Sequence, residues 1–108
     1  MKQKEIKITG RCPIRTTLEL VGGKWKLLIL HQLAEEPLRF SQLKRAIPDI
    51  SEKMLIQELK ILVQSRLVHR QDFKQVPPKV QYSLTEKGRH ALPLMAEMKK
   101  FADAYWEE

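Results

Sequence analysis

The spacing of apolar residues predicts two short helices near the start of the chain. Between residues 13 and 33, apolar side chains recur every three or four positions, the period of a helix that buries one face. Gly22-Gly23 interrupts this pattern, so one helix is expected over residues 13–21 and another over residues 24–33. The second is apolar around most of its circumference, which predicts a place at the centre of the core or at an interface.

Two further helices are predicted on either side of a turn at Pro48-Asp49. Ser41 is expected to cap a helix over residues 41–47, and Ser51 a longer one over residues 51–65. A serine hydroxyl can accept a hydrogen bond from the free N–H groups at a helix start. The longer helix is expected to turn one apolar face inward, formed by Leu55, Ile56, Leu59, Leu62 and Val63.

A β-hairpin is predicted after these helices. Residues 67–73 and 80–84 alternate apolar and polar side chains, as strands with one buried face do. Pro77-Pro78 lies between them, and because two successive prolines cannot continue a sheet ladder, this segment is expected to be the hairpin loop. Residues 38–40 alternate over a shorter stretch and predict a very short strand.

The last helix is expected to begin after Thr85 and to carry a long apolar stripe. Pro93 lies within it and removes a backbone hydrogen bond, so we expect a kink or a break between Arg89 and Pro93. The stripe is long for a helix that covers one small core, and part of it, with Trp106 beside it, is expected to pack against a partner subunit. Its members are Leu94, Met98, Phe101, Ala102 and Tyr105.

This order of elements is typical of a winged helix-turn-helix, a mainly α-helical fold with a small β-hairpin. The helix over residues 51–65 would be the recognition helix and the proline loop the tip of the wing. Because 108 residues usually form one domain, a single domain is expected over residues 1–108. It would comprise an N-terminal extension and helices (1–34), the helix-turn-helix and wing (38–84) and a C-terminal dimerisation helix (85–108).

The positive charge of the chain lies before the last helix. The net charge is +7, but residues 1–90 hold 18 basic and 9 acidic side chains and residues 91–108 hold 2 and 4. A basic excess favours polyanionic partners because each neutralised phosphate releases counterions, although a charge of this size also occurs on ordinary small domains. The first ten residues lack the apolar segment of a secretory signal, and Leu27-Leu28-Ile29-Leu30 is too short to span a membrane. A cytoplasmic protein without a membrane partner is expected.

Catalytic and metal-binding patterns are not evident in the sequence. His31, His69 and His90 are scattered, with no cysteine or carboxylate at metal-ligand spacing. The four glycines form no phosphate-binding loop, and no nucleophile is paired with a base. We therefore expect neither an enzyme nor a bound metal or cofactor.

The recognition helix offers several candidate DNA contacts. Ser51 and Lys53 stand at its start, where free N–H groups favour phosphate. Gln57 can pair with adenine, and this interpretation is favoured over a residue of a solvated helix face. Met54 has two interpretations of equal weight: a contact with a thymine methyl group, or a residue at the edge of the core.

Candidate contacts to the DNA backbone come from the neighbouring elements. The first helix of the pair crosses the backbone in this geometry, and Arg39, Ser41, Lys44 and Arg45 lie on or beside it. In the wing, Lys74 and Lys79 flank the prolines and are expected to reach the minor groove or its phosphates. Any one of these cations could instead serve solubility, and Arg70 could be a structural salt-bridge partner.

Cys12, the single cysteine, also has two interpretations. It can be a small buried hydrophobic residue at the start of the first helix. Alternatively, its thiolate can be stabilised by the helix N-terminus and by Arg11 and Arg15, and so be easily oxidised. With no second cysteine, oxidation can only link two subunits, bind a small thiol or form an adduct.

Several short motifs occur in a fixed order between about Cys12 and Trp106. They are Cys12-Pro13-Ile14, Gly22-Gly23-Lys24-Trp25, Leu38-Arg39-Phe40-Ser41-Gln42-Leu43-Lys44-Arg45, Ile50-Ser51-Glu52-Lys53-Met54-Leu55, Pro77-Pro78-Lys79-Val80-Gln81-Tyr82-Ser83-Leu84-Thr85 and Gly88. Together they resemble the HxlR-type family of bacterial winged-helix transcriptional regulators.

The resemblance implies a homodimer that binds a pseudo-palindromic operator near a promoter, and a repressor is expected. It implies a response to thiol-reactive or redox stress through Cys12, while no small-molecule effector is identified. The first and last helices would supply the dimer contact, through Ile14, Leu18, Leu94, Met98, Phe101, Tyr105 and Trp106. The alternative is a winged-helix protein-interaction module that does not bind a specific DNA sequence.

The sequence departs from the family pattern in and after the recognition helix. Ile56 stands where a threonine is common, which alters one expected base or phosphate contact, and Ile61 and Val63 replace common acids. Arg66 stands where glycine usually ends the helix. A left-handed residue there costs about 1 kcal/mol more without glycine, so this turn is expected to differ or to be strained.

Overall fold

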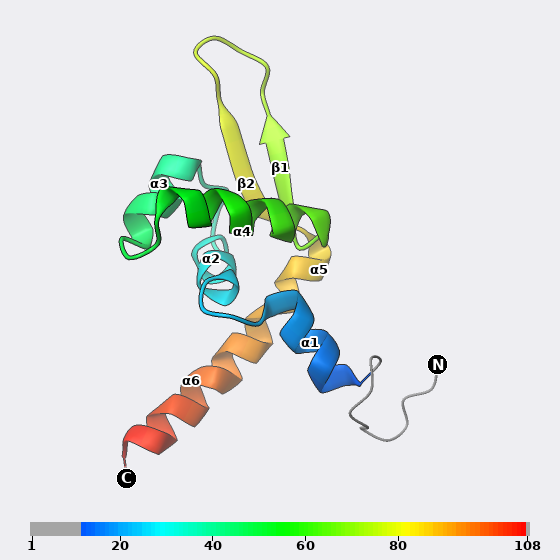
Figure 1. Ribbon diagram of the computed structural model, residues 1–108, viewed down its shortest axis with the longest axis vertical. Coiled ribbons are helices and arrows are strands. Elements are labelled where there is room, and N and C mark those ends of the chain that lie inside the picture. The colour runs from blue at the N-terminus through cyan, green and yellow to red at the C-terminus, as the bar shows by residue number, and fades with distance from the viewer. Residues whose placement is uncertain (1–11, 108) are drawn as a thin grey trace.

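The computed structural model describes residues 12–107 as a helical body from which one two-stranded hairpin projects (Figure 1). The mainly helical winged helix-turn-helix predicted from the sequence is confirmed. The elements are α1 (Pro13–Val21), α2 (Lys26–Gln32), α3 (Phe40–Ala46), α4 (Glu52–Gln64), β1 (Val68–Asp72), β2 (Val80–Leu84), α5 (Glu86–Arg89) and α6 (Leu92–Trp106).

The core lies between α2, α3, α4 and the base of the hairpin. The central place predicted for α2 is confirmed, because Ile29 and Leu30 are wholly buried. Helix α4 contributes Leu55, Leu59 and Leu62 to the same cluster. By contrast, α6 buries none of its residues.

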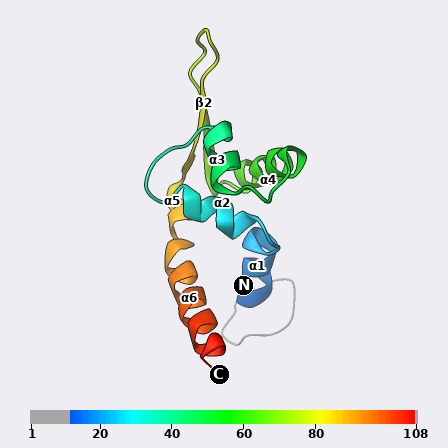
Figure 2. The ribbon, with the colours of Figure 1, turned by 90° about the vertical axis from the view of Figure 1, so that its left-hand side faces the viewer.

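The two ends of the molecule differ in the elements that they present. Figure 1 shows the hairpin at one end, with α3 and α4 at its base, and α6 at the opposite end. The side view in Figure 2 places α1 and α6 together at that opposite end. The hairpin strands pair antiparallel, with Val68 opposite Leu84 and Asp72 opposite Val80.

Helix α4 begins at the cap predicted from the sequence, but α3 does not. The Ser51 hydroxyl accepts a hydrogen bond from the Met54 N–H at 3.0 Å. Helix α3 instead has Arg39 as its N-cap, and the Arg39 N–H donates to Gln42 Oε1 at 2.8 Å. The prediction that Ser41 caps this helix is therefore wrong: the glutamine side chain satisfies the first free donor, and Ser41 lies inside the first turn.

The short strand predicted at residues 38–40 is reduced to one bridge. Leu38 exchanges two backbone hydrogen bonds with Tyr82, at 2.9 and 2.8 Å, and so adds a third short segment beside β2. Phe40 already belongs to α3. The predicted strand is correct only at its first residue, because the helix begins earlier than expected.

The last helical stretch is broken where Pro93 predicted a break. Thr85 caps α5 by accepting a hydrogen bond from the Gly88 N–H at 3.0 Å. The chain turns at His90 and Ala91, and Pro93 lies in the first turn of α6, where no N–H donor is needed. Gly88 allows α5 to approach the residue just before β1, since a Cβ atom there would collide with the Leu67 carbonyl oxygen.

Helix α4 ends in a left-handed turn at Arg66. The Leu67 N–H donates to the Leu62 carbonyl and the Arg66 N–H to the Val63 carbonyl, both at 3.0 Å. This is the Schellman arrangement, in which glycine is usual. Arg66 has φ = +66°, so the strained turn expected from the missing glycine is present.

Candidate nucleic-acid interface

Helix α4 turns a polar, basic face away from the core. Lys53, Gln57, Lys60 and Gln64 are exposed, and their spacing of three or four residues places them along one side of the helix. Of the residues predicted from the sequence, Lys53 and Gln57 lie on this face. Met54 is half-buried and packs against the core, so its core interpretation fits the structure.

Lys60 and Gln64 of this face, and the neighbouring Ile56, were not among the sequence candidates. Lys60 is exposed on the turn after Gln57, and the helical period counted from Lys53 would have found it. Ile56 was expected on the inward face, which is wrong: it is 57% exposed. Leu55, Leu59 and Leu62 already fill the inward side, and Ile56 lies one position outside it.

An ion pair holds the inner side of α4 against α2. Lys26 Nζ lies 2.9 Å from Glu58 Oε1, and the two side chains are only 15% and 13% exposed. A pair so shielded from water is screened less by salt than a surface pair. It fixes the rotation of α4 about its axis and so helps to determine which residues face outward.

Helix α3 carries the cations expected beside the recognition helix. Arg39, Ser41 and Arg45 are exposed. Lys44 is half-buried, and its ammonium group donates to the Pro48 carbonyl at 3.3 Å, in the turn before α4. Lys44 therefore helps to close the helix-turn-helix itself, while the other three side chains are open to solvent.

The two lysines near the tip of the hairpin lie in different surroundings. The Lys79 ammonium lies 4.6 Å from the centre of the Phe73 ring, a cation–π contact that orients it. Lys74 is exposed with φ = +52°, and its backbone N–H donates to Asp72 Oδ1 at 2.9 Å. Between them, Val76 is 96% exposed.

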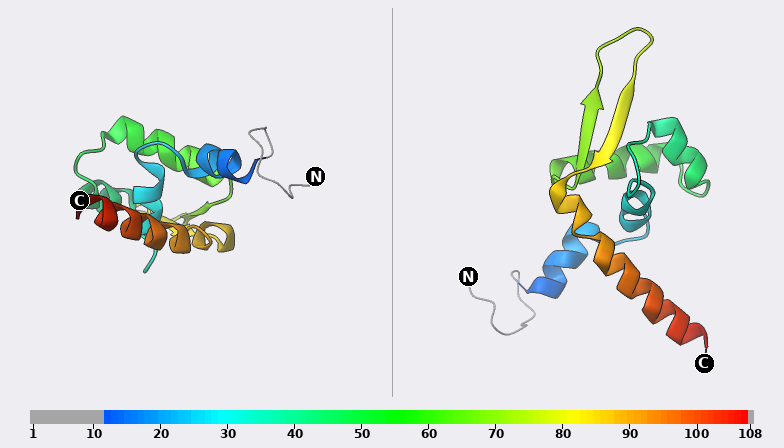
Figure 3. Two further views of the ribbon diagram at one scale, coloured as in Figure 1. Left: turned by 90° about the horizontal axis from the view of Figure 1, so that it is seen from below. Right: turned by 180° about the vertical axis from the view of Figure 1, so that it is seen from behind.

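Most cations at this end of the molecule have no acidic partner in the described part of the chain. Within residues 12–107 the ion pairs involve Lys26, Lys99 and Lys100. The cations of α3, α4 and the hairpin, Arg70 included, form none with a described residue. Figure 3 shows α3, α4 and the hairpin at the same end of the molecule. A hollow of about 350 Å³ lies between α4 and the hairpin, and Ile56, Lys60 and Arg70 help to line it. This end is suited to a polyanion.

The opposite end carries exposed apolar side chains. On α1, Ile14 and Leu18 are 53% and 63% exposed. On α6, most side chains predicted for a dimer contact are also largely exposed. Leu94 is the exception, because it is half-buried and packs against the core. The exposed fractions are 47% for Met98, 75% for Phe101, 69% for Tyr105 and 75% for Trp106.

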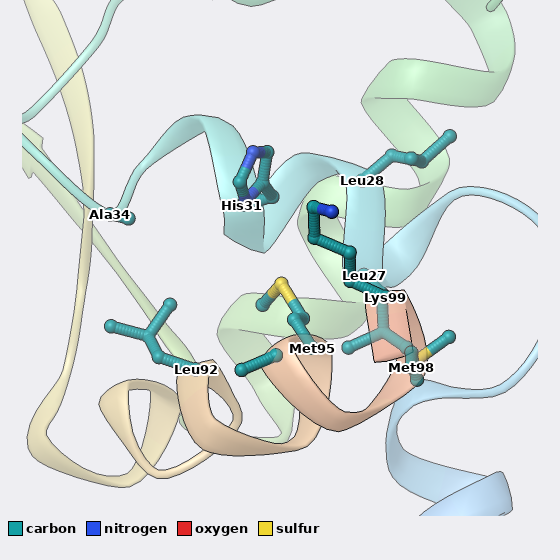
Figure 4. Close-up of a pocket in the computed structure, with 9 residues that line it drawn as sticks. Leu27, Leu28, His31, Ala34, Leu92, Met95, Met98 and Lys99 are labelled. Atoms are coloured by element: carbon teal, nitrogen blue, oxygen red, sulfur yellow. The ribbon is translucent and has the colours of Figure 1, made fainter. Parts of the chain in front are cut away.

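A largely apolar groove continues this surface between α2 and α6. Its volume is about 630 Å³. In Figure 4, Met95 of α6 points toward His31 of α2, with Leu27 and Leu92 on either side. Nothing in residues 12–107 fills this groove.

Cys12 is the N-cap of α1 and is wholly buried. Its carbonyl accepts a hydrogen bond from the Thr16 N–H at 2.8 Å. This burial matches the packed-residue interpretation of the thiol, while Arg15 is exposed and Arg11 lies outside the described residues. Among residues 12–107 there is no cluster of three metal-ligating side chains and no helix long and apolar enough to cross a membrane.

Comparison with known proteins places this arrangement in a family. A family model described as HxlR-like helix-turn-helix matches residues 20–108. The uncharacterised HTH-type transcriptional regulator YdeP of Bacillus subtilis strain 168 is 43% identical over 94 residues, which cover 87% of this chain and 73% of YdeP.

Solved structures of transcriptional regulators also match this chain. A transcriptional regulator of the MarR family from Porphyromonas gingivalis W83 matches with a TM-score of 0.83 and 46% identity, covering 89% of this chain and 95% of that one. The oxidised form of the redox regulator HypR matches with a TM-score of 0.80 and 40% identity, covering 86% and 96%. The chain therefore belongs to the HxlR-like helix-turn-helix family and is a transcriptional regulator of the helix-turn-helix type.

Proposed function

We propose that the protein is a homodimeric repressor that binds a pseudo-palindromic operator in double-stranded DNA. Helix α4 enters the major groove, α3 crosses the backbone, and the tip of the hairpin reaches the minor groove or its phosphates. The observation that carries this proposal is the outward face of α4, where Lys53, Gln57 and Lys60 lie between the cations of α3 and those of the hairpin. None of these cations has an acidic partner within residues 12–107.

The dimer is supported by the apolar face at the other end. Phe101, Tyr105 and Trp106 are each more than two-thirds exposed, beside the open groove between α2 and α6. Contiguous exposed apolar surface of this kind marks interfaces. A second copy related by a two-fold axis would cover it, and the two α4 helices would then read an inverted repeat.

Charge reversal on the DNA side tests the proposal. The double variant Lys53→Glu, Lys79→Glu should bind the protein's own upstream DNA at least tenfold more weakly than the wild type and remain dimeric. If each lysine contacts one phosphate per subunit, four contacts are lost per dimer. The slope of log K against log salt should then become shallower by about 3.6, since each contact contributes about 0.9.

The matched control is Lys100→Glu, at the opposite end of the molecule on α6. Lys100 is an exposed lysine paired with Glu97 at 3.2 Å, and its reversal should leave the affinity and the salt slope near their wild-type values. Equal losses in both variants would contradict the proposed interface. Unchanged binding of the double variant would instead favour a module that interacts with proteins.

Repression is tested by transcription in vitro from the same upstream DNA. Because a dimer bound over a promoter excludes the polymerase, the transcript should decrease in proportion to operator occupancy. An increase would identify an activator.

We further propose that thiol oxidants or electrophiles regulate the protein at Cys12. The proposal rests on the similarity to HypR, described as a redox regulator, and on the position of Cys12 at the start of α1. An oxidant that accepts two electrons and two protons would join the Cys12 thiols of two subunits. Because the thiol is buried, this end of α1 must open before it reacts.

Diamide treatment followed by non-reducing electrophoresis tests this regulation. Wild-type protein should form a covalent dimer with altered operator affinity, and both effects should be reversed by a reductant. Cys12→Ala should show neither effect while keeping its DNA affinity. A diamide-induced change in binding that persists in Cys12→Ala would exclude this residue as the sensor.

A further inference from the structure

Ile56 is a large apolar residue on the outer side of α4, at the edge of the hollow that Lys60 and Arg70 also line. Its side chain is 57% exposed. In α3, α4 and the turn between them, all of which the structure describes, no other large hydrophobic side chain is exposed. The other exposed large hydrophobic residues lie on α1, α2, α6 and the tip of the hairpin. Ile56 therefore belongs to neither the core nor the apolar end of the molecule.

The position of Ile56 on α4 indicates what kind of ligand can cover its side chain. Ile56 comes three residues after Lys53 and four before Lys60, so the three side chains lie along one side of the helix. Gln57 is next to it on the same exposed face. Neither lysine has an acidic partner among residues 12–107, and both can bind phosphates on either side of a groove.

The proposed docking brings this side of α4 against base edges. Residues in the first turns of a recognition helix contact the bases, and Ile56 is the fifth residue after the Ser51 cap. Among the base edges in the major groove, the thymine 5-methyl group is the apolar one. A β-branched side chain is stiff about χ1, so ordering it against that methyl group costs little entropy.

We propose that Ile56 is a specificity-determining residue that reads a thymine methyl group in each half of the operator. The inference rests on the proposed DNA binding and adds the base to which this side chain responds. The contact excludes water from one methyl group per half-site. Burial of a methyl-sized group contributes about a fourfold change in affinity, and loss from both halves of a symmetric site about 15-fold.

Replacing thymine by deoxyuridine tests the contact, because this removes the methyl group and leaves base pairing intact. The wild-type protein first selects a duplex from a random pool, and each thymine of that duplex is then replaced singly. The wild type should lose about fourfold in affinity at one position in each half-site and about 15-fold when both are replaced.

The Ile56→Ala variant should bind the thymine duplex more weakly and respond less than twofold to uracil at those positions. Ile56→Thr keeps one methyl group and should respond to an intermediate degree. Ile61→Val, a matched change at a half-buried position of the same helix, should keep the wild-type response to uracil. Thermal melting of each variant checks that α4 is still folded.

The outcomes separate this inference from the proposed function. If no duplex is enriched, sequence-specific binding fails, and this inference fails with it. If a duplex is enriched but uracil costs the wild type and Ile56→Ala the same at every thymine, Ile56 does not read a methyl group, while the proposed function stands.

Discussion

Replacing Arg66 with glycine should stabilise the protein. Arg66 follows the cap of α4 with φ = +66°, where a side chain with a Cβ atom is strained. The Arg66 N–H donates to the Val63 carbonyl and the Leu67 N–H to the Leu62 carbonyl, and neither backbone hydrogen bond depends on the Arg66 side chain. Glycine can adopt the same conformation without the clash.

The expected gain follows from two opposing terms. The left-handed conformation costs a residue other than glycine about 1–2 kcal/mol. Removing this strain is offset in part, by about 0.5–1 kcal/mol, because glycine increases the conformational freedom of the unfolded chain. A net gain of about 0.5–1 kcal/mol is expected, which corresponds to a rise in Tm of roughly 2–6 °C for a domain of this size.

The measurement is urea denaturation of the wild type, Arg66→Gly and Arg66→Ala at one fixed protein concentration, since dimerisation would make stability concentration-dependent. Arg66→Ala removes the same side chain but keeps the Cβ atom, so it should show no gain. If alanine stabilises as much as glycine, the benefit comes from removing the arginine, and the strain argument is refuted.

Three further changes test other contacts. Gly88→Ala should destabilise by about 2 kcal/mol or more, because its methyl group would meet the Leu67 carbonyl oxygen; chemical denaturation measures this, and wild-type stability would exclude the close approach. Phe101→Glu should raise the Kd of the proposed dimer on the order of 100-fold, as followed by sedimentation; an unchanged dimer would mean that α6 is not at the interface. Lys26→Met and Glu58→Gln should each lower the free energy of unfolding by about 1–2 kcal/mol, between the values for exposed and buried ion pairs. If the two losses simply add in a double-mutant cycle, the two side chains are not coupled.

Local signals predicted the elements of the fold closely. The strand over residues 80–84, the Ser51 cap and the break before Pro93 lie where the sequence indicated, because each depends on residues a few positions apart. The Ser41 cap was wrong for the same kind of reason. A nearby glutamine competes for the same backbone donor, and the serine pattern does not reveal which side chain prevails.

The candidate site was predicted less completely than the fold. The spacing of Lys53 and Gln57 correctly placed both on an exposed face, but the same pattern assigned Ile56 to the core and left Met54 undecided. Helical periodicity divides a helix into an apolar and a polar side, and residues at the border can fall on either. Which border residue is covered depends on the elements packed against the helix.

The sequence by itself determined the order of the elements, most of their ends and the separation of basic and apolar residues along the chain. Tertiary structure decided which surfaces remain open. Packing of α2 and the hairpin on α4, with the Lys26–Glu58 pair across the contact, sets the rotation that leaves Ile56 outside. The core closes without any fully buried residue of α6, which leaves its aromatic side chains exposed. These outcomes depend on contacts between segments far apart in sequence, which no local pattern encodes.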